Sequence, residues 1–349
     1  MRLARALFGT PGNAVLTLAM LGLFAWALPP LLHWAFAAAT WEGASRRACA
    51  PDGACWAFIR ARLALFFYGR YPAEERWRAD LCFVLLLAGL ALCMALRRRR
   101  GAALLALLIA TPVVGGVLLA GGAFGLRPVP TVDWGGLMLN VVLSFVAVGF
   151  AIPLGILLAF GRRSRLRLLR WGSTALIEFW RGVPLLSVLF MGLVLLPLVL
   201  PAGVTVDNLA RALIVLTLFA SAYAAEVVRG GLQGVPPGQT EAALALGLHE
   251  AQAKRLVVLP QAMRIAVPGL VNIAVDLFKD TTLVSIVGLF DLMGVVGQSL
   301  KDQAWLGLAA EGYVFAALVF FACCLVISLA GGVLERQFSP EARGSGLPH

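Results

Sequence analysis

Long apolar runs alternate with short polar breaks along this chain, and the runs have the length of membrane spans. About 20 mostly apolar residues cross a bilayer as a helix. Runs of this kind predict helices over residues 14–35, 80–96, 102–122, 136–160, 174–200, 209–228, 265–289 and 313–334. The sequence therefore predicts an all-α polytopic membrane protein with about eight transmembrane helices.

Polar segments divide these runs into an N-terminal part and a core. Residues 37–79 are extramembrane, and their aromatic, Arg-bearing stretch 56–70 predicts an interfacial helix. A Pro/Gly-rich link at 127–130 marks the boundary. We expect residues 1–130 to hold three transmembrane helices and a periplasmic loop, residues 131–336 a five-helix core, and residues 337–349 a cytoplasmic tail.

Composition and charge narrow the class of protein. The 349 residues are 60% hydrophobic and 13% charged, which excludes a soluble domain. The formal net charge of +11 does not indicate nucleic-acid binding, because no basic helix or aromatic platform accompanies it. Positive charge beside apolar spans is instead an orientation signal. The basic clusters at 97–100 and 162–167 predict that these loops and both termini are cytoplasmic.

The loop between the sixth and seventh runs is too short and polar to span a bilayer. The Pro-Pro-Gly triplet at 236–238 breaks the preceding helix. Thr240 then caps a new helix with Glu241 in its first turn, where the helix dipole favours a carboxylate. Gly247 ends that helix in a left-handed conformation. A second short helix is expected over residues 248–260, stopped by its final proline.

The spacing in this loop resembles the EAA loop of ABC-importer permeases, with Val257 where that family has Ile. The resemblance implies that the loop is a coupling helix seated in a cytoplasmic ATPase subunit. The residues implied to couple to the ATPase are Glu241, Ala242, Ala243, Gly247, Leu259 and Pro260. One chain supplies one loop, so the resemblance also implies two copies of the ATPase and a second permease subunit.

Three further stretches resemble, more narrowly, permeases for polar amino acids: EFWRGVPLL at 178–186, SAYAAEVVRGG at 221–231 and FKDTTLVS at 278–285. With CWAF at 55–58 and GRYP at 69–72, the chain resembles the longer permease of a general L-amino-acid system. That resemblance implies import of L-amino acids across a bacterial inner membrane from a periplasmic binding protein. It also implies that ATP and Mg are bound by the ATPase, with no cofactor on this chain.

Charged residues inside the seventh run are candidates for a substrate pathway. Charges at bilayer depth are costly and usually face a cavity or each other. The candidates here are Asn272, Asp276, Lys279, Asp280, Thr281 and Thr282, and the first four share a helix face. One interpretation is a pathway that meets the charges of a zwitterion. The alternatives are a structural Lys279–Asp280 pair, or a span that ends at Phe278 and leaves both charges at the outer interface.

A second pair of candidates opens the fifth run. Glu178 and Arg181 are three residues apart, so we expect them to pair on one helical turn, with a kink at Pro184. They either line the pathway or form an ion pair at the cytoplasmic interface. Glu226 and Arg229 have the same spacing, and we expect them to stabilise the approach to the coupling loop.

Cys49 and Cys55 lie in the segment predicted to be periplasmic, where disulfides persist. The turn former Pro-Asp-Gly at 51–53 can bring them within bonding distance. The predicted pair is a disulfide, and the alternative is two free thiols in a flexible loop.

The sequence contains no pattern that indicates an enzyme. The three His residues have no metal-ligand spacing, no P-loop motif occurs, and no nucleophile–base set is present. An ion-coupled secondary transporter is the main alternative, although its expected inverted repeats are not found. A membrane-embedded enzyme or an assembly scaffold is a weaker one.

Overall fold

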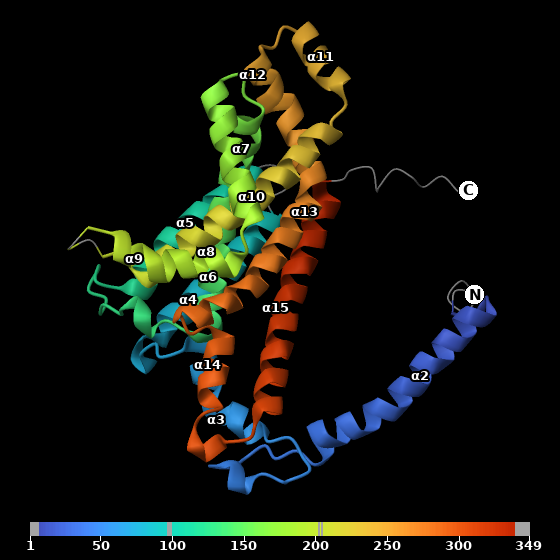
Figure 1. Cartoon of the computed structure of the whole chain (residues 1–349), viewed down its shortest axis with the longest axis vertical. Coiled ribbons are helices and arrows are strands. Elements are labelled where there is room, and N and C mark those ends of the chain that lie inside the picture. Colours follow the sequence, from blue (N-terminus) through green and yellow to red (C-terminus); the bar gives the residue numbers. More distant parts are fainter. Residues whose placement is uncertain (1–6, 96–99, 202, 204, 339–349) are drawn as a thin grey trace. The chain divides into compact units, whose positions relative to one another are not determined.

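The computed structural model describes residues 7–95, 100–201, 203 and 205–338, and its regular elements are helices (Figure 1). Residues 97–99 of the first basic cluster and 339–349 of the predicted tail lie outside the described residues. In chain order the longer helices are α2 (Pro11–Leu32), α3 (Trp56–Tyr68), α4 (Arg76–Ala95), α5 (Arg100–Ala120), α6 (Gly136–Arg162), α7 (Arg167–Gly182), α10 (Asn208–Gly234), α13 (Leu259–Asp280) and α15 (Ala309–Phe338).

Shorter helical elements connect them. These are α8 (Leu185–Phe190), α9 (Leu196–Val199), α11 (Pro237–Ala245), α12 (Glu250–Gln252) and α14 (Leu292–Ser299). Turns of π-helix precede α9 and α13, and a 3-10 helix over Thr281–Val287 follows α13. The chain forms two compact units: Met1–Ala64 with Val296–Phe315, and Leu65–Val295 with Ala316–His349.

Five helical segments of the described chain are long and apolar enough to cross a membrane: Pro11–Ala37, Gly136–Arg162, Asn208–Gly234, Glu250–Val287 and Ala309–Arg336. A bent pair over the fifth predicted run would be a sixth. The second and third predicted runs form α4 and α5, and the described apolar part of α5 is the shorter segment Ala110–Ala120. The all-α membrane fold is confirmed, and the number of eight spans stays a prediction.

Helices α6, α10 and α13 form the centre of the second unit, where α10 packs on both of the others (Figure 1). The face of α6 that meets α10 carries small residues four apart, including Ala151 and Gly155. A Cβ atom on Gly155 would lie 2.6 Å from the Cβ of Ala224. Small residues let helix backbones approach closely in a membrane, which explains why α6 and α10 share this contact.

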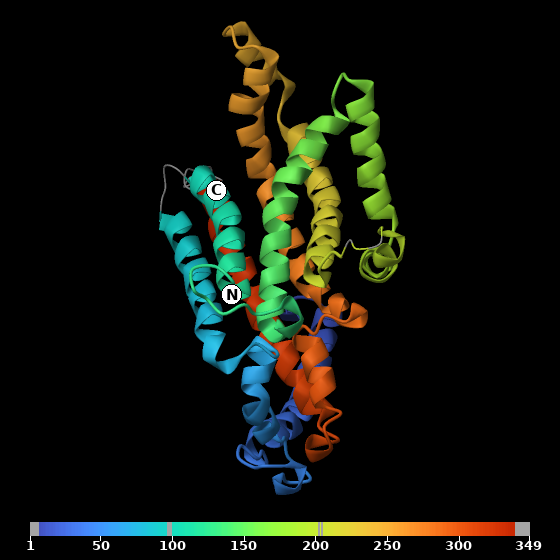
Figure 2. The same ribbon diagram turned by 90° about the vertical axis from the view of Figure 1, so that its left-hand side faces the viewer.

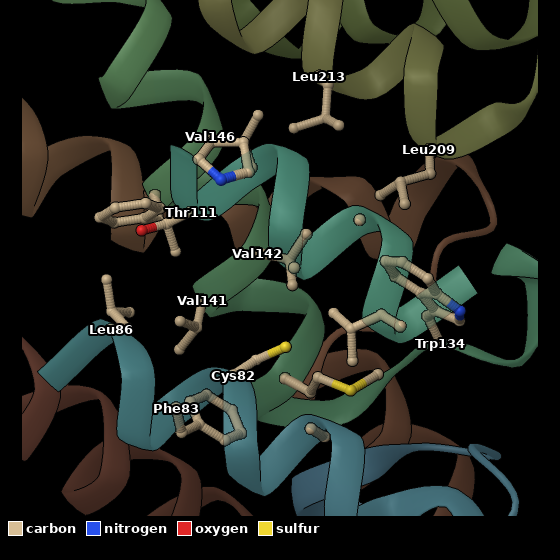
Figure 3. A pocket seen from close by; sticks show the side chains of 17 residues that line it. Cys82, Phe83, Leu86, Thr111, Trp134, Val141, Val142, Val146, Leu209 and Leu213 are labelled. Atoms are coloured by element: carbon tan, nitrogen blue, oxygen red, sulfur yellow. The ribbon is translucent and has the colours of Figure 1, made fainter. Parts of the chain in front are cut away.

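Helices α4 and α5 pack against each other, and α5 also packs on α6 (Figure 2). A cavity of about 200 Å³ lies among α4, α5, α6 and α10. Figure 3 shows that its walls are mainly apolar side chains such as Leu86, Val142 and Leu213. The described lining residues include no Asp, Glu, Lys, Arg or His, so the cavity is unsuited to a zwitterion.

The fifth predicted span is broken, and not merely kinked at Pro184. Helix α7 ends at Gly182, and the segment from Leu185 to Val199 leaves it at 105°. Proline lacks an N–H group and disfavours the helical conformation in the residue before it. Val183 is accordingly extended, with φ −108° and ψ 134°. The result is a broken span or a re-entrant loop.

The seventh span also differs from its predicted bounds, because Pro260 does not stop a helix. Helical structure continues from Glu250 to Val287. A π-helical turn over Ala253–Val258 precedes α13, and Pro260 therefore falls in the first turn of α13. In a first turn the missing N–H of proline costs no helical hydrogen bond.

Candidate functional site

The loop between α10 and α13 contains the predicted helix, glycine elbow and second helix. Helix α11 begins at Pro237 and not after a cap at Thr240. Proline suits the first helical position, because its φ is already helical and its absent N–H has no partner there. Thr240 and Glu241 therefore lie inside the helix, one turn later than predicted.

Gly247 ends α11 in the left-handed conformation, with φ +84°. The N–H of Gly247 donates to the carbonyl of Leu244, and the N–H of Leu248 donates to that of Ala243. These two bonds form a Schellman motif, which satisfies the last carbonyls of a helix when a residue at this position is left-handed. A glycine here sets the direction in which the chain enters α12.

The candidate coupling residues lie mostly on the surface of this loop. Glu241, Ala242, Gly247 and Pro260 are exposed, Leu259 is half-buried and Ala243 is buried. Leu246, which sequence reasoning did not single out, is 85% exposed at the elbow. The exposed leucine gives the elbow an apolar tip.

Ion pairs join this loop to the turn between α6 and α7. Arg165 lies 2.8 Å from Glu250, which also pairs with Lys254 at 3.4 Å. Figure 1 shows α7, α11 and α12 at the same end of their unit. The pairs are exposed and individually weak, and the one between Arg165 and Glu250 joins the loop to the turn before α7.

Glu178 and Arg181 do not pair with each other as predicted. Glu178 lies 2.8 Å from Arg162 of α6, and Arg181 lies 3.8 Å from Glu226 of α10. Both side chains form ion pairs with residues of neighbouring helices. Residue spacing along a single helix cannot predict such pairs. We call the residues Arg162, Glu178, Arg181, Glu226 and Arg229 the Glu226 cluster.

The centre of the Glu226 cluster is the carboxylate of Glu226. It lies 2.8 Å from Arg162 and 2.7 Å from Arg229, the latter three residues on as the spacing predicts. Sequence reasoning missed Arg162 as a partner, because it appeared only as part of a basic cluster. The cluster ties together α6, α7 and α10.

The candidates on α13 fall into an exposed group and a buried one. Lys279 pairs with Asp276 at 2.8 Å, and both side chains are more than half exposed. The pair with Asp280 is therefore not the one that forms, and both Lys279 and Asp280 lie in the last turn of α13. Asn272 is exposed on the same helix, and Asp280 and Thr282 are half-buried.

Thr281 belongs to a buried polar network that the sequence did not indicate. Asn140 of α6 donates to the hydroxyl of Thr281 at 2.7 Å and to the carboxylate of Asp291 at 3.0 Å. It also accepts from the N–H of Leu292 at 3.0 Å. All three polar side chains are fully buried. Burial raises the pKa of the Asp291 carboxyl, and the hydrogen bond from Asn140 opposes that rise.

Comparison with known proteins decides the family. Residues 151–340 match the family described as the binding-protein-dependent transport system inner membrane component, and this match covers more than half of the 349 residues. The chain belongs to this family. It is therefore a multi-pass inner membrane permease, and its loop between α10 and α13 lies within the matched part.

Relatives of the permease resemble it over almost its whole length. The inner membrane amino-acid ABC transporter permease protein YhdY of Escherichia coli (strain K12) is 46% identical over 334 residues, 95% of this chain and 91% of the relative. The glutamate/glutamine/aspartate/asparagine transport system permease protein BztC of Rhodobacter capsulatus is 38% identical over 408 residues, 97% of this chain and 93% of the relative.

A solved structure supports the fold of the permease core. It is described as the crystal structure of an amino acid ABC transporter with histidines, and it matches with a TM-score of 0.52 at 30% identity. The match covers 58% of this chain and 92% of that chain. These relatives leave the ion-coupled alternative without support.

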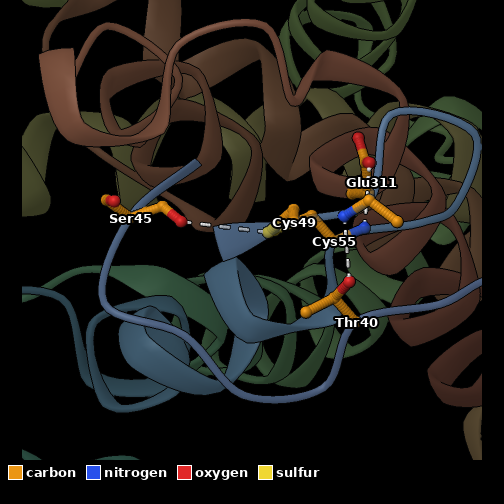
Figure 4. The surroundings of a disulfide bond; sticks show 6 residues. Thr40, Ser45, Cys49, Cys55 and Glu311 are labelled. Atoms are coloured by element: carbon orange, nitrogen blue, oxygen red, sulfur yellow. Dashed lines mark hydrogen bonds between the residues drawn. A yellow bond between two sulfur atoms is a disulfide. The ribbon is translucent and has the colours of Figure 1, made fainter. Parts of the chain in front are cut away.

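The first unit of the permease contains a disulfide between Cys49 and Cys55, whose Cα atoms are 5.5 Å apart (Figure 4). The N–H of Cys55 donates to the buried carboxylate of Glu311 at 3.1 Å. Nearby, Arg62 pairs with Asp302, and the rings of Phe58 and Trp305 lie 5.7 Å apart. The segment around the disulfide thus contacts residues about 250 positions later in the chain through a hydrogen bond, an ion pair and an aromatic pair.

The disulfide gives a test of the predicted topology. In a permease whose other described cysteines, Cys82, Cys93, Cys323 and Cys324, are replaced by Ala, an impermeant maleimide should leave intact spheroplasts unlabelled. Labelling should appear after reduction, because the segment is expected in the oxidising periplasm. Labelling without reductant would contradict the bridge, and no labelling after reduction would contradict the periplasmic placement.

Proposed function

We propose that this permease translocates L-amino acids from the periplasm to the cytoplasm as the membrane subunit of an ATP-driven importer. The observation that carries the proposal is the exposed helix–Gly247–helix loop, closed by a Schellman motif and linked by Arg165 and Glu250 to the core helices. A structured, exposed loop of this kind can transmit the movement of a bound ATPase. The names of the relatives supply the substrate class.

The partners follow from the same loop. Each chain has one coupling loop, so two copies of a cytoplasmic ATPase require a second permease subunit. ATP and Mg are bound by the ATPase and no cofactor by this chain, and a periplasmic binding protein delivers the amino acid. The coupling residues are Glu241, Ala242, Ala243, Gly247, Leu259 and Pro260, with both termini on the ATPase side of the membrane.

The substrate pathway in this proposal follows the exposed polar face of α13. Asn272, Asp276 and Lys279 lie on the surface of the isolated chain. Polar groups at membrane depth are favourable where they face a water-filled path or a partner. The proposal also assigns Asp280, Thr281, Thr282, Glu178 and Arg181 to the pathway, although Thr281 is buried beside Asn140 and the two residues of α7 pair with α6 and α10.

Co-purification and uptake together test the function. The tagged permease should isolate in a fixed ratio with an ATPase, and proteoliposomes of the complex should accumulate radiolabelled L-glutamine only with ATP and binding protein. Uptake driven by an ion gradient without ATP would support the ion-coupled transporter instead. Isolation of the permease without an ATPase would contradict the proposed role of the loop.

The charges at the end of α13 give a separate prediction. Lys279→Gln and Asp276→Asn should each reduce uptake by about tenfold while the complex assembles, since hydrogen bonds to charged groups contribute about 1.5–3 kcal/mol. Asp280→Asn should do the same if Asp280 lines the path. The exposed Lys301→Gln is the control and should transport normally. Normal uptake by all three variants, or failure of each to assemble, would leave these residues a structural role only.

A further inference from the structure

The Glu226 cluster contains more positive than negative charge. Among the described residues it joins three guanidinium groups, those of Arg162, Arg181 and Arg229, to two carboxylates, those of Glu178 and Glu226. An excess charge that is partly withdrawn from water is costly unless a counter-ion or a water molecule lies next to it. The cluster therefore carries one positive charge without a matching carboxylate.

The excess positive charge is on Arg181. Arg162 lies 2.8 Å from both carboxylates, and Arg229 holds Glu226 through two hydrogen bonds of 3.0 and 2.7 Å. Arg181 has one contact with a carboxylate, at 3.8 Å, which is too long for a hydrogen bond. Its guanidinium lies over the ring of Tyr223, 5.8 Å from the ring centre.

Arg181 and Tyr223 are also accessible. The side chain of Arg181 is 37% exposed and Tyr223 is 38% exposed, whereas Glu226 behind them is 16% exposed. Arg181 precedes by one residue the end of α7, where the span breaks and turns through 105°. Broken helices in transporters form substrate sites.

The chemistry of this arrangement suits a carboxylate. A guanidinium presents a planar fork of donors that matches a carboxylate with two parallel hydrogen bonds. An incoming carboxylate can replace Glu226 as the partner of Arg181. Glu226 does not become unpaired, because its ion pairs with Arg162 and Arg229 remain. Such an exchange of ion-pair partners costs little free energy and is reversible. A site that binds a substrate only during transport must release it in the same way.

We propose that Arg181, backed by the ring of Tyr223, binds the α-carboxylate of the amino acid during its passage. This proposal rests on the proposed function, since it assumes that amino acids cross the permease. It assigns to the Glu226 cluster a second role beyond joining three helices. Glu226 and the ring of Tyr223 set the position of the guanidinium, and Glu226 does not touch the substrate.

The test compares an amino acid with the same molecule lacking its α-carboxylate. Binding of L-glutamine and of its α-amide to the solubilised complex, without binding protein, should differ by about tenfold or more, because charge-assisted hydrogen bonds are lost with the amide. Arg181→Gln should bind both compounds with equal, weak affinity. Arg181→Lys should regain part of the preference, since it keeps the charge but not the fork.

A matched control separates this site from the general charge of α7. Arg170→Gln removes an exposed positive charge from the same helix and should leave the preference for the acid unchanged. The proposal is overturned if Arg181→Gln, in an assembled complex, still prefers the acid as the wild type does. Failure of the wild-type complex to take up any amino acid would instead count against the proposed function, because the binding assay does not depend on uptake.

Discussion

A permease carrying Gly247→Val is expected to insert and assemble normally but to lose ATP-driven uptake. Gly247 has φ +84°, and nothing lies within 4 Å of where its Cβ would be. The substitution therefore meets no steric obstacle, and its cost is the left-handed backbone, about 1–2 kcal/mol for an ordinary residue. A β-branched residue tolerates this conformation least. The chain after α11 should leave in a different direction and misplace α12.

The expected size is a fall in uptake of about tenfold or more, because each 1.4 kcal/mol changes a population tenfold. Hydrolysis of ATP by the complex should continue, so the ratio of hydrolysis to uptake in proteoliposomes is the measurement. Two variants serve as controls. Gly247→Asn should retain much of the uptake, since Asn tolerates the left-handed region, and Gly238→Ala adds a methyl group to the same loop in open space with an ordinary φ.

Normal coupling in a well-assembled Gly247→Val complex would remove the geometric basis of the proposed function. A loss of uptake in both Gly247→Val and Gly238→Ala would show that any substitution in the loop impairs transport. The effect is due to the left-handed conformation itself only if Gly247→Val loses uptake and Gly247→Asn retains it.

The fold was predictable where it depends on the composition of single segments. Apolar runs of sufficient length located α6, α10 and α15, because a helix must satisfy its own backbone in a bilayer. The outcome at the prolines was not predictable from the sequence. Pro184 ends a helix and Pro260 begins one, since the effect of a proline depends on the hydrogen-bond register of the turn before it.

The candidate site was predictable only in its local part. The elbow at Gly247 depends on a few neighbouring residues, so its spacing was informative. Glu226 contacts Arg162, 64 positions away, and Asn140 contacts Leu292, 152 positions away, and no periodicity encodes such distances. A signal for Asn140 did exist, because a lone amide inside an apolar run is costly and therefore has a partner, but the partner could not be named.

Asn140 is the residue whose loss should most reduce the stability of the core. Its amide makes three hydrogen bonds, to the hydroxyl of Thr281, the carboxylate of Asp291 and the N–H of Leu292. Asn140→Leu keeps a similar volume but leaves these groups without that partner. An unsatisfied buried group costs about 1–3 kcal/mol, and more if charged. The melting temperature of the purified complex should therefore fall by about 2–6 °C.

The defect of Asn140→Leu should also depend on pH. Burial already raises the pKa of Asp291, and removal of the opposing hydrogen bond should raise it further. An acid whose pKa is raised in the folded state stabilises that state at low pH, and the stabilisation is lost as pH rises through the folded pKa. The fall in melting temperature should accordingly be larger at about pH 8 than at about pH 5. Ser144→Ala, one turn along α6, removes a hydroxyl that donates to the carbonyl of Val141 at 3.3 Å and should change little at either pH. Equal melting temperatures for Asn140→Leu and Ser144→Ala would show that the buried network does not hold α6 to the end of α13.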